Sequence, residues 1–217
     1  MLPFARMLDQ CKKDGWAVGT LSFSLVRWEA DRLGYQEVPI RRGGPPISTL
    51  KPHDAREAHA PSLSAVYGKG DQPLHTDGAH LANPPDLIAL HCGGVNEIPT
   101  KVLPLIGDLS PGYSARIHMT HGIFLVQNGH DSFFAPAYEG NRYRYDPGCM
   151  TPCDSRSRRT VDYFAGLAER AIEISWDEPE KFLLLDNRRV LHGRPAATED
   201  PNRELQRVCL SLKRGAA

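Results

Sequence analysis

The stretch LIALHCGGVNEIPTKVLPLIGD, residues 87–108, indicates the fold class most directly. It contains two apolar runs of strand length, Leu87–Cys92 and Lys101–Leu105, separated by glycine, asparagine and proline. Short apolar runs bounded by turn-forming residues are typical of β-strands. The same pattern predicts further strands over Leu63–Tyr67, Ser114–Met119, Ile123–Gln127, Asn141–Asp146, Lys181–Leu185 and Glu204–Leu212.

Fewer segments have a helical pattern. Residues 5–14 are expected to form a helix that ends at Gly15, and the GWAVG segment then enters the core as a strand. A second helix is expected over residues 24–33, ending at Gly34. A third is indicated by helical spacing after a possible N-cap at Thr160, with the apolar positions Val161, Phe164, Ala168, Ala171 and Ile172.

Many short strands with few helices predict a mainly β fold with flanking helices, a sandwich or small barrel such as a jelly roll. The regular strand–helix alternation of a doubly wound α/β fold is absent. The 217 residues suit a single domain over 1–217. Within it we expect N-terminal helices and a loop-rich, lid-like region over 1–62, because residues 39–62 contain five prolines, and a β core over 63–213.

Charge and composition exclude several classes of protein. Lys+Arg and Asp+Glu are both 26, so nothing indicates a nucleic acid or an anionic membrane as partner. No apolar segment is long enough to cross a bilayer, and the N-terminus lacks a secretory pattern, so the cytoplasm is the expected compartment. Five scattered cysteines do not form a disulfide framework, and a zinc site on Cys149 and Cys153 lacks two further ligands.

The tripeptide His75-Thr76-Asp77 is the first feature with chemical content. In a strand, residues two apart point to the same face, so His75 and Asp77 can converge on one point. An imidazole and a carboxylate belong to the facial triad that binds iron(II) and leaves coordination positions open. Because so short a motif also occurs by chance, it needs support from elsewhere in the chain.

The segment LLLDNRRVLHGR, residues 183–194, supplies a candidate third ligand. His192 follows an apolar strand and a polar turn, which places it at the rim of a pocket. Arg203 and Arg207 then lie four positions apart at the start of the last predicted strand, so both can face the same side. An arginine fork binds a carboxylate through two hydrogen bonds, as a dicarboxylate cosubstrate requires.

With these motifs in order, the sequence resembles the taurine dioxygenase and clavaminate synthase-like family of iron(II)/2-oxoglutarate oxygenases. The resemblance rests on PLHTDGAH (73–80), RYDPG (144–148), DNRRVLHGR (186–194) and NRELQR (202–207). It implies a double-stranded β-helix, the cupin-like form of the jelly roll. It also implies Fe(II), with 2-oxoglutarate and O₂ as cosubstrates.

The resemblance assigns roles residue by residue. His75, Asp77 and His192 match the iron ligands and therefore the catalytic centre. Arg203 matches the arginine that pairs with the far carboxylate of 2-oxoglutarate. Thr100 is the candidate for the assisting threonine, although the Gly-Gly-Asp that usually precedes it is missing.

Arg207 is a candidate for both the cosubstrate and the substrate. In taurine-oxidising relatives the matching arginine holds the substrate's anionic group. The sequence offers three more candidates for substrate contact, Tyr67, His80 and Arg144, each with an equal or better interpretation as a structural residue. Asp186 and Asn187 are expected either to shape a turn or to orient His192.

The expected reaction is oxidation, by default hydroxylation, of a C–H bond in a small molecule, with release of succinate and CO₂. An amino acid or another carboxylate is the candidate substrate class. Desaturation or cyclisation, the substrate's identity and the oligomeric state stay open. Two alternatives remain: a catalytically silent, cupin-like binding module, and a zinc-dependent hydrolase that uses the same triad. A zinc-dependent hydrolase would not explain why Arg203 and Arg207 are present.

Overall fold

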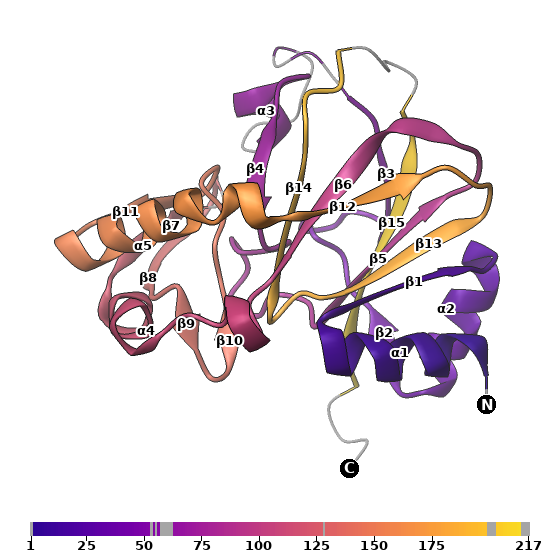
Figure 1. Cartoon of the computed structure of the whole chain (residues 1–217), viewed down its shortest axis with the longest axis horizontal. Coiled ribbons are helices and arrows are strands. Elements are labelled where there is room, and N and C mark those ends of the chain that lie inside the picture. Colours follow the sequence, from indigo (N-terminus) through magenta and orange to yellow (C-terminus); the bar gives the residue numbers. More distant parts are fainter. Residues whose placement is uncertain are drawn as a thin grey trace.

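The structure is a computed structural model that describes residues 2–52, 54, 56, 63–127, 129–198 and 203–213. Two antiparallel sheets pack face to face, and a separate lobe extends from one end of them (Figure 1). This arrangement confirms the predicted mainly β jelly roll with flanking helices.

The larger sheet has six strands in the order β1-β13-β5-β15-β2, with β3 also paired to β15. Its strands are β1 (Trp16–Thr20), β2 (Tyr35–Glu37), β3 (Ile47–Leu50), β5 (Leu87–Cys92), β13 (Lys181–Asp186) and β15 (Leu205–Leu212). The central strand β5 is buried on both faces, which explains why its sequence is apolar except for His91 instead of alternating. Leu87 and Ala89 face the helices, whereas Ile88 and Leu90 face the second sheet.

The smaller sheet has four strands in the order β12-β6-β14-β4. They are β4 (Gln72–His75), β6 (Asn96–Pro104), β12 (Ile172–Trp176) and β14 (Val190–Arg194). A buried apolar cluster that includes Ile88, Val102, Trp176 and Leu183 fills one end of the space between the sheets. The other end is left for the polar residues described below.

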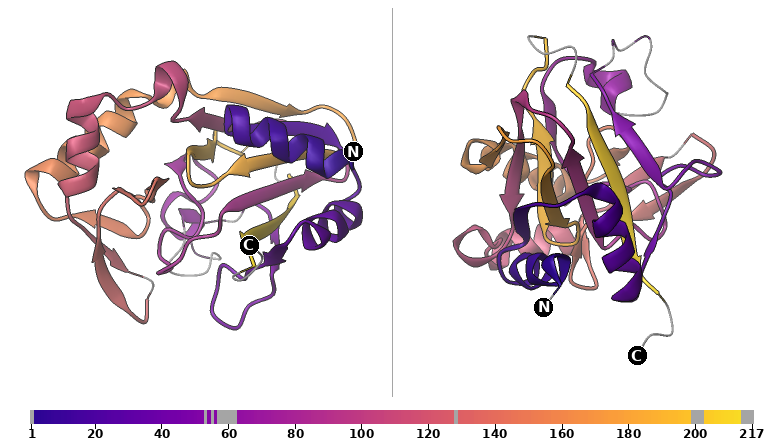
Figure 2. Two further views of the ribbon diagram at one scale, coloured as in Figure 1. Left: turned by 90° about the horizontal axis from the view of Figure 1, so that it is seen from below. Right: turned by 90° about the vertical axis from the view of Figure 1, so that its right-hand side faces the viewer.

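Two helices cover the outer face of the larger sheet, α1 (Pro3–Asp14) and α2 (Phe23–Arg32), and lie beside each other in Figure 2. Phe4, Met7 and Val26 from these helices are buried against Leu184 of β13. Helix α1 ends at Gly15, whose φ of 84° is readily accessible only to glycine. Both N-terminal helices and the strand after the first are therefore confirmed.

The lobe, residues 105–171, is inserted between β6 and β12, and its apolar core is continuous with Leu74, Leu103 and Leu191 of the smaller sheet. It contains helices α4 (Tyr113–His121) and α5 (Ser155–Gly166), the 3₁₀ turns η1 (Gly107–Leu109) and η2 (Ala168–Arg170), and short strands. The strands are β7 (Phe124–Gln127), β8 (Ser132–Ala135), β9 (Tyr138–Glu139), β10 (Arg142–Tyr143) and β11 (Met150–Pro152).

Two predicted strands are wrong. Leu63–Tyr67 is helix α3, and Ser114–Met119 lies within helix α4. Short apolar windows do not separate strand from helix, because both can bury one side of a few residues. Tertiary packing decides the second case: α4 packs against α5, with Met119 and Phe164 in one buried cluster.

The helix expected after Thr160 begins earlier and ends sooner. Its N-cap is Asp154, and Ile172 belongs to β12. The Asp154 carboxylate accepts hydrogen bonds from the backbone N–H groups of Ser157 at 2.7 Å and Ile123 at 3.0 Å. The capping box therefore fixes the start of the helix, which the apolar spacing alone had placed too late. Within Asn141–Asp146, only Arg142–Tyr143 is a strand.

Among the described residues, no helix is long and apolar enough to span a bilayer. The expected lid region contains β3, and residues 53, 55 and 57–62 lie outside the described residues. The lid and the division of the chain at residue 62 stay predictions.

The capping contacts of Asp154 predict a pH-dependent stability. Replacing it by alanine should cost about 1 kcal/mol at neutral pH, because the cap of α5 is lost. Hydrogen bonding, foremost from the Ser157 N–H, holds the pKa of Asp154 below its ordinary value. Its stabilisation should therefore be complete above the unfolded-state pKa of about 3.9 and disappear as the pH falls through the lowered folded-state pKa.

Urea unfolding of wild type and Asp154→Ala at several pH values measures this effect. Asp162→Asn, an exposed carboxylate on the same helix, is the matched control and should change little. A difference between wild type and Asp154→Ala that persists unchanged at pH 2 would contradict the assignment.

Candidate metal centre

Two histidines meet on neighbouring strands of the smaller sheet. His192 of β14 is paired directly with His75 of β4, and their ring centroids are 4.5 Å apart. The strands approach closely at this point: a Cβ on Gly193 would lie 2.5 Å from the carbonyl oxygen of Gln72. Glycine in the His192-Gly193-Arg194 segment therefore permits the pairing that brings the imidazoles together.

Asp77 completes the group from a different position than the sequence suggested. Strand β4 ends at His75, so Asp77 lies in the turn beyond it and not in the strand. Its carboxylate oxygens lie 4.0 Å from His75 Nε2 and 3.6 Å from His192 Nε2. The predicted convergence of the three side chains is therefore present, although strand alternation is not its cause. All three side chains are buried.

The hydrogen bonds around the group fit a bound cation. His75 Nδ1 is 2.9 Å from the Pro73 carbonyl oxygen and donates to it, which leaves the lone pair of Nε2 directed at the other ligands. Asp77 Oδ2 is buried and has no hydrogen-bond partner among the described residues. A buried carboxylate oxygen beside two imidazole nitrogens is the donor set of a divalent metal site. Among the described residues, these three form the only such group.

The charge states also suit a metal. Burial lowers the pKa of His192 to about 3, with a further contribution from His75, so its imidazole is neutral at physiological pH. Burial would raise the pKa of Asp77, but the charge of Arg207, followed by the two histidines, holds it below its ordinary value. The centre therefore presents an ionised carboxylate and a neutral imidazole without needing to release protons first.

The turn that carries Asp77 is held by the lobe. The Thr76 N–H donates to the Tyr145 carbonyl at 2.7 Å, and the Tyr145 N–H donates to Thr76 Oγ1 at 3.1 Å. The Arg144 guanidinium donates to the carbonyl oxygens of Ala79, Leu81 and Ala82 at 2.5, 2.6 and 3.0 Å. The RYDPG segment thus fixes the ligand turn from outside the sheet.

The turn between β13 and β14 holds Asp77 from the other side. Asn187 Oδ1 accepts from the Asp77 N–H at 2.9 Å, and Asn187 Nδ2 donates to the Asp77 carbonyl at 2.9 Å. Asp186 accepts hydrogen bonds from the guanidinium groups of Arg188 and Arg189. Asn187 therefore holds the metal ligand Asp77, not His192 as one of the two interpretations of the sequence had it.

Both predicted arginines face the same cavity as the triad. Arg203 lies just before β15 and is buried, with Nη2 3.4 Å from Thr100 Oγ1 and Nε 3.3 Å from the Ile98 carbonyl. The Trp176 indole N–H donates to the same Thr100 hydroxyl at 3.2 Å. Arg207 of β15 forms an ion pair with Asp77, with 2.7 Å between Nη1 and Oδ1. Arg203 and Thr100, which the sequence assigned separately to the cosubstrate, are therefore neighbours.

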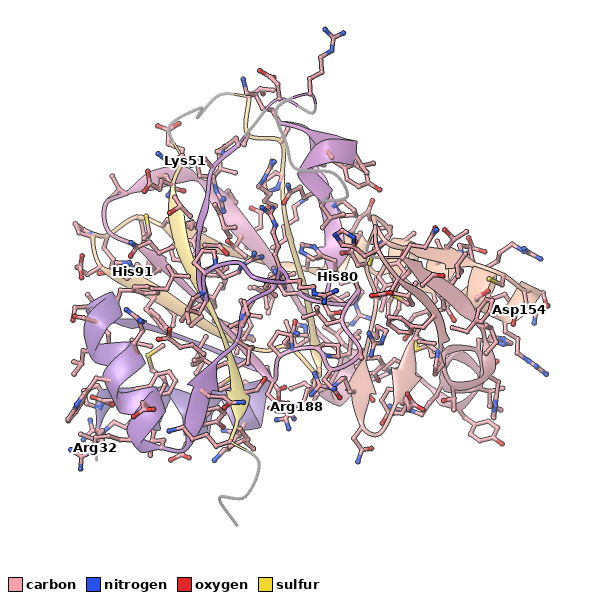
Figure 3. All side chains as sticks on the ribbon, turned by 180° about the vertical axis from the view of Figure 1, so that it is seen from behind. Arg32, Lys51, His80, His91, Asp154 and Arg188 are labelled. Atoms are coloured by element: carbon pink, nitrogen blue, oxygen red, sulfur yellow. The ribbon has the colours of Figure 1, made fainter. Side chains whose placement is uncertain are left out.

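The cavity has a volume of about 560 Å³ and lies between the sheets, the lobe and the segment around residues 40–51. His80, one of the predicted substrate residues, lines it; Figure 3 shows His80 near the centre of the molecule, between the jelly roll and the lobe. Its Nε2 donates to the Ile40 carbonyl at 3.0 Å.

The other two predicted substrate residues do not line the cavity. Tyr67 lies in α3, and Arg144 is engaged with the carbonyl oxygens of the ligand turn. The sequence analysis missed several residues that do line it. Arg194 could have been found from its position two after His192. Asp146 belongs to the RYDPG motif, although its place in the cavity wall was not predicted. Arg41 and Asp131 could not have been found, because nothing local in the sequence shows that their loops border the metal centre.

Comparison with known proteins places this geometry in context. No protein-family model matches the chain, and no curated protein matches it in sequence. Solved structures do match. An asparagine oxygenase in complex with Fe(II), 2S,3S-3-hydroxyasparagine and succinate superposes with a TM-score of 0.69 at 15% identity, over 97% of this chain and 78% of that one.

The non-heme iron oxygenase OrfP is also similar. Its complex with Fe and alpha-ketoglutaric acid has a TM-score of 0.70 at 18% identity, over 97% of this chain and 78% of that one. Its complex with Fe, succinate and (3S)-hydroxy-L-Arg has a TM-score of 0.68 at 19% identity, over 95% and 77%. The chain has the fold of these iron oxygenases. At this level of identity, the likeness establishes the jelly roll and not the activity.

The geometry of the triad predicts that each ligand is needed for metal binding. His75→Ala, Asp77→Ala and His192→Ala should each lose most affinity for Fe²⁺, because two donors remain in a site built for three. Anaerobic titration of metal-free protein with Fe²⁺ measures the effect. His121→Ala, an exposed histidine of α4, is the control and should bind like wild type. Wild-type affinity in His192→Ala would contradict the triad.

Proposed function

We propose that the chain is an iron(II)- and 2-oxoglutarate-dependent dioxygenase that hydroxylates a C–H bond of a small molecule, releasing succinate and CO₂. The observation that carries the proposal is the position of two charged groups in one cavity. The His75–Asp77–His192 triad lies on one wall, and the buried Arg203 guanidinium with Thr100 lies close by in the same space.

In this proposal the triad holds iron(II) through two imidazole Nε2 atoms and a carboxylate oxygen, and the remaining coordination positions face the cavity. The bound iron with 2-oxoglutarate and O₂ supplies the oxidation of the C–H bond. The protein contributes the rest. Burial between two sheets keeps water away, and the pairing of β4 with β14 fixes the distance between the imidazoles.

Arg203 is the proposed anchor for the distal carboxylate of 2-oxoglutarate, with Thr100 as its helper. The guanidinium is buried and has its Nη2 directed at the Thr100 hydroxyl, which can donate its own proton to a carboxylate oxygen. A fork of N–H donors beside a hydroxyl is complementary to a carboxylate. Trp176 keeps Thr100 in place by donating to its oxygen.

Arg207 is the proposed contact for an anionic group of the substrate. Its side chain lines the cavity, where one N–H donates to Asp77 and Nε is buried without a partner in the described part of the chain. The solved oxygenases of this fold include complexes with hydroxylated asparagine and arginine. We therefore propose an amino acid or another small carboxylate as substrate, with His80 on the cavity wall nearby.

Succinate formation that requires both O₂ and 2-oxoglutarate tests the proposal. A panel of free amino acids supplies the candidate substrates, and hydroxylated product is detected by mass spectrometry. A zinc-dependent hydrolase or a silent binding module would consume no 2-oxoglutarate under any of these conditions. The cytoplasmic location and the absence of a nucleic acid partner stay predictions.

The two arginines should separate in their effects. Arg203→Ala should weaken 2-oxoglutarate binding by about a hundredfold or more, because breaking a buried charge pair costs about 3–5 kcal/mol. In the iron(II)-loaded protein, where the cation would compensate the Asp77 carboxylate in place of Arg207, Arg207→Ala should retain 2-oxoglutarate affinity within a few-fold, but weaken substrate binding and uncouple succinate formation from product formation. Anaerobic titration of each iron(II) variant with 2-oxoglutarate, followed by its metal-to-ligand charge-transfer band, measures the difference.

Two outcomes would revise these roles. Equal losses of 2-oxoglutarate affinity in both variants would show that the arginines form one cosubstrate clamp. A loss confined to Arg207→Ala would mean that the assignments are reversed. Arg188→Ala, which removes a guanidinium bound to Asp186 outside the cavity, is the matched control and should bind 2-oxoglutarate like wild type.

A further inference from the structure

We propose that Asn187 is a positioning residue for the metal centre: its side-chain amide fixes the backbone of Asp77 and thereby the direction of the ligand carboxylate. The inference rests on the metal site of the proposed function. Asn187 binds only backbone atoms of Asp77, not its carboxylate, and it does not line the cavity.

The side chain of Asn187 makes three hydrogen bonds, all within normal length. Oδ1 accepts from the Asp77 N–H at 2.9 Å, while Nδ2 donates to the Asp77 carbonyl at 2.9 Å and to the Pro85 carbonyl at 3.0 Å. The side chain is 1% exposed, so water does not compete for these groups. Both donor hydrogens of the amide are in use, and both polar backbone atoms of Asp77 are bound to it.

The arrangement replaces a missing strand neighbour. The pairing of β4 with β14 includes His75 but stops before Asp77, whose backbone groups are nevertheless buried inside the protein. In an antiparallel ladder, a paired residue exchanges one N–H and one C=O with its partner. The Asn187 amide offers the same pair of groups, so it gives the ligand Asp77, two residues beyond the end of β4, the hydrogen bonds that a strand neighbour would supply.

The turn that contains Asn187 does not need this side chain. The Arg189 N–H donates to the Asp186 carbonyl at 2.9 Å, and the Arg188 N–H donates to Asp186 Oδ1 at 3.1 Å. Asparagine is common in turns because its side chain bonds to nearby backbone. Here all three side-chain bonds leave the turn and reach residues 77 and 85. Shaping the turn therefore does not account for Asn187.

The position of Asn187 along the chain links two ligands. The same turn leads directly into β14, which carries His192, while the Asn187 amide holds Asp77. One short segment thus sets the position of a histidine through the strand and of a carboxylate through the amide. A displacement of Asn187 would change the separation of Asp77 and His192, whose closest side-chain atoms are 3.6 Å apart.

The test compares metal affinity with stability. Asn187→Ala should lower Fe²⁺ affinity by about ten- to a hundredfold, the range seen when partners that orient metal ligands are removed. Arg142→Ala is the matched control, because Arg142 also makes three buried or half-buried hydrogen bonds to the same loop, to Pro84, Pro85 and Asp86, but none to the ligand turn before residue 84. Its Fe²⁺ affinity should stay within about twofold of wild type.

The melting temperature of each metal-free variant is measured in parallel, and both should fall. A purely structural Asn187 would lower this temperature without changing Fe²⁺ affinity relative to the control, and that result would overturn the inference. If Asn187→Ala does not fold, Asn187→Asp decides. It retains the acceptor for the Asp77 N–H but places an oxygen against two carbonyl groups, so its Fe²⁺ affinity should also fall at least tenfold. Wild-type affinity in Asn187→Asp would overturn the inference equally.

The outcome is separable from that of the proposed function. Wild-type protein that binds Fe²⁺ but forms no succinate with any substrate would contradict the proposed reaction and leave the titration of Asn187→Ala valid. Wild-type protein that forms succinate while Asn187→Ala binds Fe²⁺ normally would contradict only the role of Asn187.

Discussion

The ion pair between Arg207 and Asp77 joins the two sheets, and both residues line the cavity. Arg207 belongs to the larger sheet and Asp77 follows a strand of the smaller one, so the contact of 2.7 Å connects the two layers across the space between them. A buried carboxylate is costly unless charge and hydrogen bonds compensate it. The surrounding structure supplies that compensation, and in doing so it fixes the geometry on which the metal centre depends.

The backbone of the turn that carries Asp77 is held by segments far apart in the sequence. The lobe contributes Tyr145 and Arg144, which bind the backbone of the ligand turn, and the β13–β14 turn contributes Asn187. Each uses a hydrogen bond to a backbone group, so these contacts fix the path of the main chain in the turn. The lobe is therefore part of the architecture of the metal centre and not only a wall of the substrate cavity.

The sequence predicted which residues form this site better than it predicted the elements and hydrogen bonds that hold them. His75, Asp77 and His192 could be found as candidate ligands because few residue types bind iron and their order is informative. Strands β5 and β13 could be found because each contains a run of consecutive apolar residues. The helices α3 and α4 were mistaken for strands, since a few apolar residues fit either structure. Asn187 and Arg144 lie in motifs that the sequence did indicate, but their partners could not be predicted, because the backbone groups of Asp77 and Ala79 that they bind lie 110 and 65 residues away.

The fold is shared with solved oxygenases at only 15–19% identity, for a physical reason. Main-chain hydrogen bonds and apolar strand cores tolerate many substitutions, whereas the ligand set and the residues that satisfy its buried backbone do not. Arg41 and Asp131 also line the cavity, but their side chains are exposed. Neither residue takes part in the hydrogen bonds that hold the turn of Asp77, so substitutions at these two positions are expected to leave that turn in place.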